Sequence, residues 1–216
     1  MAKGVKLGMQ IKEIRQLEKG KNKIILENDD YVLLYYKELK AFKMVQEEEI
    51  NEDTWQLARK TMITRGKKRV YHLLGKKDYV IEEIRKKLVK EDYPVAIIET
   101  ILDYFIELGF LNDKSYTEKY YRYQKATKSR RIIEMKLSEK GIPREIIKAF
   151  FETVDHQETE YETAENLLKK KYNNKEVTKE DYNKMARFLA YKGFDYDVIK
   201  PVIMTYLKST EETYDS

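Results

Sequence analysis

The strongest constraint on the fold is an internal repeat of apolar residues from about residue 53 onward. Seven positions that begin at Ile84 stay apolar or aromatic after a shift of 49 residues, and again after a further 52. The three sets are Ile84, Leu88, Tyr93, Ile97, Ile98, Ile101 and Leu102; Ile133, Leu137, Ile142, Ile146, Ile147, Phe150 and Phe151; and Met185, Leu189, Phe194, Val198, Ile199, Val202 and Ile203. A repeat of this length is typical of tandem units that bury their apolar faces against their neighbours.

Each repeat predicts three helices. The expected ranges are 54–74, 78–90 and 94–108, then 113–126, 129–140 and 143–154, and finally 157–172, 179–192 and 195–208. Pro94 and Pro143 suit the first turn of a helix, where no hydrogen bond is lost. Gly141 and Gly193 suit the end of a helix, and Asp92 stands in the corresponding place of the first repeat. A tight turn therefore joins the last two helices of each repeat.

Other residues mark helix starts and irregularities. Asn112 and Thr178 are expected to cap helices, because their side chains can accept backbone hydrogen bonds. Gly66 could break the long first helix, and Pro201 should bend the last helix, inside which it falls. A unit of about 45–60 residues buries little surface alone, so the repeats are expected to share apolar faces in an elongated, curved array.

The first fifty residues follow a different pattern. Lys23–Glu27 and Tyr31–Tyr35 are two β-rich runs on either side of an Asn-Asp-Asp loop, which predicts a hairpin. The expected fold class is mainly α, with three tandem three-helix repeats after a small N-terminal β-rich module. The expected domains are the β-rich module at 1–50 and helical repeats at 51–110, 111–154 and 155–216.

Composition excludes several classes of site. The chain has no Cys, and His72 and His156 stand alone, so metal and thiol chemistry are not expected. Gly20-Lys21, Gly66-Lys67 and Gly75-Lys76 lack the spacing of a phosphate-binding loop. The sequence predicts no cofactor and no enzymatic activity. No apolar run is long enough to span a membrane, and the first residues lack the apolar core of a secretion signal, so a cytoplasmic protein without a membrane partner is expected. A monomer is also expected.

Positive charge is concentrated in the middle of the chain. Residues 111–154 carry a net charge of +5, whereas residues 155–216 carry −3. One acid-free segment spans Lys119–Ile133, and a second spans Arg59–Lys77. Cations at three-residue steps share one helical stripe, which suits a phosphate backbone or an acidic protein. The candidate binding residues are Lys67, Lys68, Arg69, Lys119, Arg122, Lys125, Lys128, Arg130 and Arg131.

Tyrosines are interleaved with the cations of the Lys119–Ile133 segment. Such rings can stack on unpaired bases, or they can pack a helix against its neighbours. Core packing is expected for Tyr116 and Tyr120, while both roles stay open for Tyr121 and Tyr123. Reversing Arg130 and Arg131 together to Glu is expected to weaken partner binding without unfolding the chain.

Two segments resemble signatures of the RecX family, regulators of the RecA recombinase. Glu107–Tyr116 reads ELGFLNDKSY and is followed by Tyr120 and Tyr121, as at the junction of the first two repeats in that family. Ser129–Ile142 reads SRRIIEMKLSEKGI and resembles the second-repeat segment. The three-helix repeats and the β-rich extension, found in Gram-positive members, extend the resemblance over nearly the whole chain.

The resemblance implies a non-enzymatic modulator that binds RecA, free or as its filament on single-stranded DNA. It implies restraint of ATP hydrolysis and strand exchange, with some direct affinity for DNA. Two alternatives stay open from the residues themselves: a helical-repeat nucleic-acid-binding protein that acts without RecA, and an unrecognised hydrolase.

Overall fold

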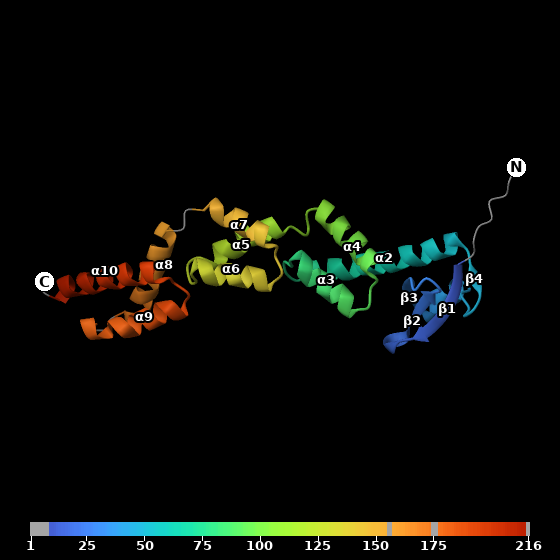
Figure 1. Cartoon of the computed structure of the whole chain (residues 1–216), viewed down its shortest axis with the longest axis horizontal. Coiled ribbons are helices and arrows are strands. Elements are labelled where there is room, and N and C mark those ends of the chain that lie inside the picture. Colours follow the sequence, from blue (N-terminus) through green and yellow to red (C-terminus); the bar gives the residue numbers. More distant parts are fainter. Residues whose placement is uncertain (1–8, 155–156, 174–176, 215–216) are drawn as a thin grey trace. The chain divides into compact units, whose positions relative to one another are not determined.

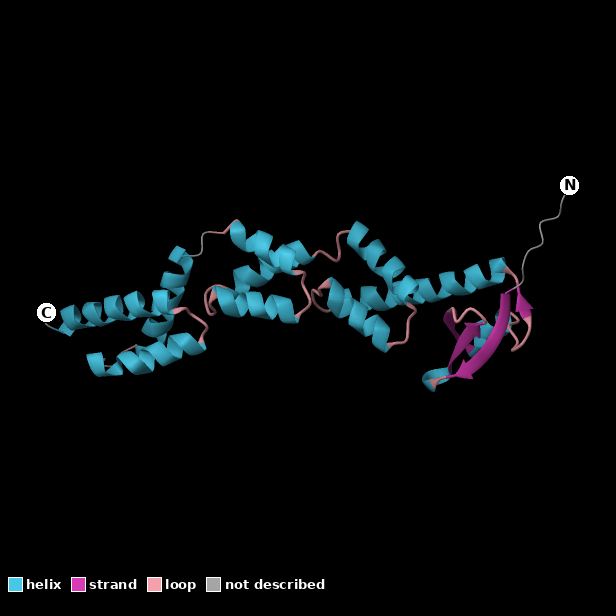
Figure 2. Cartoon of the chain, viewed as in Figure 1, coloured by secondary structure: helices cyan, strands magenta, loops and turns pink. Residues whose placement is uncertain are grey.

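The computed structural model describes residues 9–154, 157–173 and 177–214. The chain is mainly helical, and its strands are confined to an N-terminal sheet (Figures 1 and 2), which confirms the predicted fold class. Two compact units are present, residues 1–111 and 112–216. The elongated, curved arrangement and the four domain boundaries stay predictions. His156 lies outside the described residues.

The N-terminal module is a four-stranded antiparallel sheet in the order β3-β2-β1-β4. Its strands are β1 (Met9–Gln16), β2 (Lys21–Leu26), β3 (Tyr31–Tyr35) and β4 (Glu49–Ile50). The predicted hairpin is confirmed as β2 and β3, and Asp29 in its loop adopts a φ of 61°. Sequence patterning did not identify β1 or the short helix α1 (Tyr36–Ala41).

The first helical repeat consists of α2 (Glu52–Leu74), α3 (Ile81–Lys90) and α4 (Val95–Glu107). The expected break at Gly66 is wrong, because α2 continues through it and Gly66 is buried. A Cβ placed on Gly66 would lie 2.3 Å from Cδ1 of Ile101 and 3.1 Å from the Tyr93 ring. The glycine therefore allows α2 to approach α4 closely.

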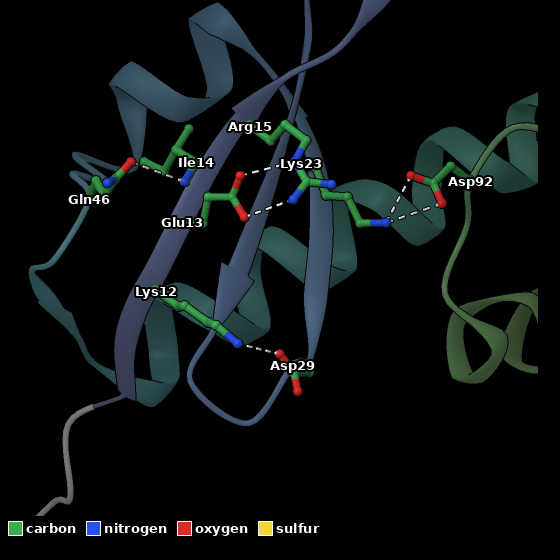
Figure 3. Close-up of polar contacts among 8 residues, drawn as sticks. All are labelled: Lys12, Glu13, Ile14, Arg15, Lys23, Asp29, Gln46 and Asp92. Carbon is green, nitrogen blue, oxygen red and sulfur yellow. Dashed lines mark hydrogen bonds and ion pairs between the residues drawn. The ribbon is translucent and has the colours of Figure 1, made fainter.

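Ion pairs join the sheet to the first repeat. Arg59 on α2 pairs with Asp30 at 3.1 Å, and Arg65 pairs with Glu38 of α1. Lys23 on β2 lies 3.0 Å from the carboxylate of Asp92, in the turn between α3 and α4 (Figure 3). The Arg59–Lys77 segment is thus acid-free only in sequence, because the fold brings carboxylates to it from other elements.

Asp92 occupies the left-handed region with a φ of 61°, where the other repeats have Gly141 and Gly193. Its carboxylate accepts from the Lys23 ammonium and, at 3.4 Å, from the Tyr31 hydroxyl. Burial and the adjacent Asp92 charge raise the pKa of Tyr31 to about 12, so this hydroxyl keeps its proton at neutral pH. The non-glycine residue therefore attaches the sheet to the repeat at some cost in backbone strain.

Asp92→Asn should lower the free energy of unfolding by about 1 kcal/mol, because it removes the charge from a half-exposed ion pair but keeps a residue that tolerates left-handed φ. Asp92→Gly should cost less, since relief of the backbone strain offsets the lost ion pair. Urea unfolding at low and high salt measures both losses, and the Asn loss should shrink with salt. A larger loss for Gly than for Asn would contradict this account.

The second unit contains two further three-helix repeats. The first comprises α5 (Asp113–Gln124), α6 (Arg130–Glu139) and α7 (Arg144–Glu152). The next comprises α8 (Gln157–Tyr172), α9 (Tyr182–Tyr191) and α10 (Tyr196–Tyr214), with a short 3-10 turn, Lys179–Asp181, before α9. The helix α10 continues through Pro201, and the expected bend there stays a prediction.

The predicted helix caps and the repeated apolar positions are found in the structure. Asn112 caps α5 by accepting from the Ser115 amide at 3.0 Å, and Thr178 and Asp181 form the expected capping box. Across all three repeats the recurring apolar positions are buried, apart from half-buried Ile146 and Phe150. The apolar repeat in the sequence therefore identifies the residues that face the helix interfaces.

Candidate interaction surface

The cations of the Lys119–Ile133 segment do not follow a single helix. The helix α5 ends at Gln124 and α6 begins at Arg130, so the helical stripe expected from Lys119 to Lys128 is wrong. Lys119 and Arg122 lie on α5, and Arg130 and Arg131 begin α6. Lys125 and Lys128 belong to the connection between these helices, residues 125–129, which we call the basic turn.

The basic turn is held in place by α8. The hydroxyl of Thr163, a buried residue, donates to the backbone carbonyl of Lys125 at 2.8 Å. The carboxylate of Glu160 accepts from the backbone amide of Arg130 at 2.6 Å. Because both bonds reach the backbone, they fix the path of the turn without using its lysine side chains.

The turn between α9 and α10 also packs against the basic turn. Ser129 is buried there, and its hydroxyl oxygen caps α6 by accepting from the Ile132 amide. Gly193 approaches so closely that an added Cβ would lie 2.6 Å from the Ser129 hydroxyl oxygen and 2.4 Å from Cγ1 of Ile132. The last repeat therefore positions the cations of the preceding one.

The cations around the basic turn differ in availability. Arg122 and Lys125 are exposed, and neither forms an ion pair with a residue in the described part of the chain. Arg131 has 76% of its side chain exposed and lies 3.8 Å from the equally open Asp195, so this pair is weak. Lys128 is half-buried, and Lys119 is exposed but has an interaction within the protein.

Arg130 has a structural role. Its guanidinium donates to Glu134 at 2.6 Å and lies 5.0 Å from the centroid of the Phe151 ring. A glutamate at this position would place like charges beside Glu134, and near Glu160 at the helix start. We therefore expect Arg130→Glu to perturb the packing of α6 and α7, which makes it unsuitable as a test of binding alone.

The tyrosines divide between packing and exposure. Tyr121 packs edge-on against Phe150 and Phe151, with ring centroids 5.3 and 5.7 Å away. Tyr116 and Tyr120 are half-buried and stack on each other, and partial burial raises the pKa of Tyr120 above its ordinary value. Tyr123 is 80% exposed beside the basic turn, so its ring is available to a ligand.

The three candidate residues on α2 differ in the contacts that their side chains make. Lys67 places its ammonium 3.3 Å from the centroid of the Tyr104 ring, and Arg69 donates to Glu91 at 2.8 Å. Of the three, only Lys68 is exposed, while Lys67 and Arg69 are half-buried. These three residues belong to the first unit and the other six candidates belong to the second.

Sequence reasoning missed the residues that position the basic turn. Thr163, Glu160 and Gly193 lie in the last repeat, far along the chain from the turn. The placement of Gly193 at a helix end was predicted, but nothing in the sequence pairs any of these residues with Lys125, Ser129 or Arg130.

Metal-binding and membrane-spanning features were also sought in the described ranges. Within residues 9–154, 157–173 and 177–214, no group of three or more His, Asp or Glu side chains is arranged to hold a metal ion. No helix in these ranges combines the length and the apolar character that crossing a bilayer requires.

Known proteins with this architecture match over most of the chain. The family model described as RecX, third three-helix domain, matches residues 158–203. The regulatory protein RecX of Clostridioides difficile strain 630 is 30% identical over 210 residues, covering 93% of this chain and 97% of the relative.

Two crystal structures have the same fold. One, of a regulatory protein RecX, aligns with a TM-score of 0.57 and 25% identity, covering 90% of this chain and 98% of that one. The other, RecX from Lactobacillus salivarius, aligns with a TM-score of 0.58 and 29% identity over 67% of this chain and 96% of that one. With a sheet-plus-repeat fold and a 30% identical relative matched along nearly its full length, this chain belongs to the RecX family.

Proposed function

We propose that this chain is a non-enzymatic regulator that binds RecA, both free and as its filament on single-stranded DNA. Binding mostly inhibits ATP hydrolysis and strand exchange by RecA. The observation that carries the proposal is the match to a regulatory protein RecX over 93% of this chain and 97% of that relative.

The basic turn supports a direct contribution to DNA binding. Arg122, Lys125 and Arg131 supply exposed cations on a backbone that α8 and the α9–α10 turn hold in place. Phosphate contacts of this kind favour DNA of any sequence. If the bound regulator has different affinities for the active and inactive filament, it shifts their populations by that difference, and no covalent step is needed.

An ATPase titration tests the proposal. Added protein should slow DNA-dependent ATP hydrolysis by RecA, at amounts well below RecA if it caps filament ends, or near one per several protomers if it coats the groove. Binding to RecA should also persist without DNA. Unchanged ATPase rates and filament lengths at low salt would overturn the proposed function.

Neutralising the exposed cations should weaken DNA binding without loss of stability. For Arg122→Gln, Lys125→Gln and Arg131→Gln combined, we expect at least about a tenfold loss of affinity for oligothymidylate at low salt. The slope of log K against the logarithm of the salt concentration should become shallower by about 2 if all three residues contact phosphate. Fluorescence anisotropy over a salt series measures both quantities.

The matched control removes the same charge elsewhere on the second unit. Lys170, Lys200 and Lys208 are exposed, and within the described ranges they form no ion pair. Their combined change to Gln should leave the affinity nearly unchanged. Equal losses for the two triple variants would show that net charge, and not the basic turn, governs binding.

A second candidate function is nucleic-acid binding that does not involve RecA. The exposed ring of Tyr123 beside Lys125 favours it, because such a ring can stack on an unpaired base. This function predicts a steep loss of affinity with salt that is the same with and without RecA.

A further inference from the structure

A hollow of about 570 Å³ lies in the first unit, between α2 and the segment where β3 leads into α1. The face of α2 contributes Leu57, Lys60, Thr61, Thr64, Arg65 and Lys68. Tyr35 and Glu38 form the opposite wall. Lys68 is one of the candidate binding residues predicted from the sequence, but neither the RecX resemblance nor the basic turn assigns a role to the hollow itself.

The groups best suited to phosphate are already engaged. Both terminal nitrogens of Arg65 donate within the protein, one to the Leu33 carbonyl at 3.1 Å and the other to Glu38. The Arg65 guanidinium also covers one face of the Tyr35 ring, 4.6 Å from its centroid. The paired fork that recognises phosphate is therefore already used within the protein, and one face of the Tyr35 ring is covered.

The threonine hydroxyls are likewise occupied. Thr61 donates to the Leu57 carbonyl and Thr64 to the Lys60 carbonyl, each at 2.8 Å within α2. These hydroxyl protons are therefore not offered to a ligand, which weakens the case for a nucleic-acid backbone, since many of its contacts come from such donors.

Two ammonium groups and an apolar wall are available. Lys60 and Lys68 are exposed, and neither forms an ion pair among the described residues. They lie eight residues apart, roughly 12 Å along the helix axis. Leu57 is 50% exposed and Tyr35 is 38% exposed, so apolar surface accompanies the two charges.

We propose that this hollow binds an acidic amphipathic segment of a partner protein. Carboxylates of the segment pair with Lys60 and Lys68, and an apolar side chain packs against Leu57 and the exposed part of Tyr35. Glu38 does not repel the segment, because Arg65 and the Tyr35 amide compensate its charge. The site goes beyond the proposed function, because it binds a protein segment and needs no DNA. Any partner protein with a segment of this chemistry could occupy it.

The test uses the full chain and a fluorescein-labelled synthetic helix carrying Glu and Leu on one face. Fluorescence anisotropy should show binding, and Lys60→Gln with Lys68→Gln should weaken it about tenfold. Leu57→Gln should also weaken it, because the apolar contact is lost. Two comparison peptides, one with Gln for every Glu and one of Glu alone, should each bind more weakly than the mixed peptide.

Lys76→Gln with Lys90→Gln is the matched control. Both residues are exposed in the same unit but lie outside the hollow, so the peptide affinity should stay unchanged. Thermal melts followed by circular dichroism should show that all variants fold.

The proposed site would be overturned if the mixed peptide did not bind, or if the two double-lysine variants lost the same peptide affinity. It would also be overturned if the Lys60 and Lys68 variant lost as much affinity for oligothymidylate as for the peptide. The last outcome would identify a nucleic-acid site. None of these measurements contains RecA, so failure here is distinct from failure of the ATPase titration.

Discussion

Gly193→Ala should lower the free energy of unfolding of the second unit by about 2–4 kcal/mol. About 1–2 kcal/mol comes from backbone strain, because Gly193 has a φ of 86° and a residue with a Cβ is disfavoured there. The remainder comes from overpacking, because the new Cβ would lie 2.4 Å from Cγ1 of Ile132 and 2.6 Å from the Ser129 hydroxyl oxygen. Urea unfolding of the full chain, followed by circular dichroism, measures the loss.

Gly109→Ala is the matched control for this prediction. Gly109 has a φ of 73°, yet an added Cβ would meet no atom within 4 Å. Its cost should therefore be backbone strain alone, about 1–2 kcal/mol. Ile132→Ala in the Gly193→Ala background should recover part of the loss by making room, which a double-mutant cycle detects. Equal costs at the two glycines would show that the close approach to the basic turn has no energetic consequence.

The same substitution has a functional consequence. Because the α9–α10 turn packs against Ser129, a shift at Gly193 displaces the basic turn that carries Lys125 and Lys128. We therefore expect Gly193→Ala to weaken oligothymidylate binding even at temperatures where the chain stays folded.

Gly66→Ala should destabilise the first unit by about 1 kcal/mol, although alanine normally favours a helix interior by about 1 kcal/mol over glycine. The added Cβ would lie 2.3 Å from Cδ1 of Ile101 and 3.1 Å from the Tyr93 ring, and both side chains are buried. Overpacking of about 1–3 kcal/mol therefore outweighs the gain in helix propensity. Thermal and urea unfolding of the full chain measure the change.

Gly75→Ala provides the comparison at the end of the same helix. Its backbone is helical, and the nearest atom to an added Cβ is the Tyr71 carbonyl oxygen at 3.4 Å. Little or no loss of stability is expected there. If Gly66→Ala were as neutral as Gly75→Ala, the close crossing of α2 and α4 would not require glycine.

The helices were largely predictable because each depends on residues close in sequence. Apolar residues at helical spacing, Asn112 at a helix start and glycine after a helix end act within one or two turns. The repeat also identified the buried positions, because residues that stay apolar in every repeat are those that pack between its helices. The β2–β3 hairpin was predicted for the same reason, whereas β1 was missed because its pattern is irregular and its pairing with β2 contains a register shift.

The candidate site was only partly predictable. The sequence shows where cations are dense but not which of them have partners, because several partners come from distant elements. Arg69 pairs with Glu91, and Arg65 pairs with Glu38, so both partners come from outside the Arg59–Lys77 segment. On the other cluster, Arg130 is occupied by Glu134 while Arg131 stays open to solvent.

The sequence by itself determined the helical repeat, the hairpin and the uneven distribution of charge, since these follow from the order of residues along a short stretch of chain. Tertiary structure alone decided which charges remain available, how Thr163 and Gly193 hold the basic turn, and that Lys60 and Lys68 line the same hollow as the exposed Leu57. The physical reason is that the environment of a charge depends on every group within a few ångströms, and folding brings those groups from anywhere in the chain.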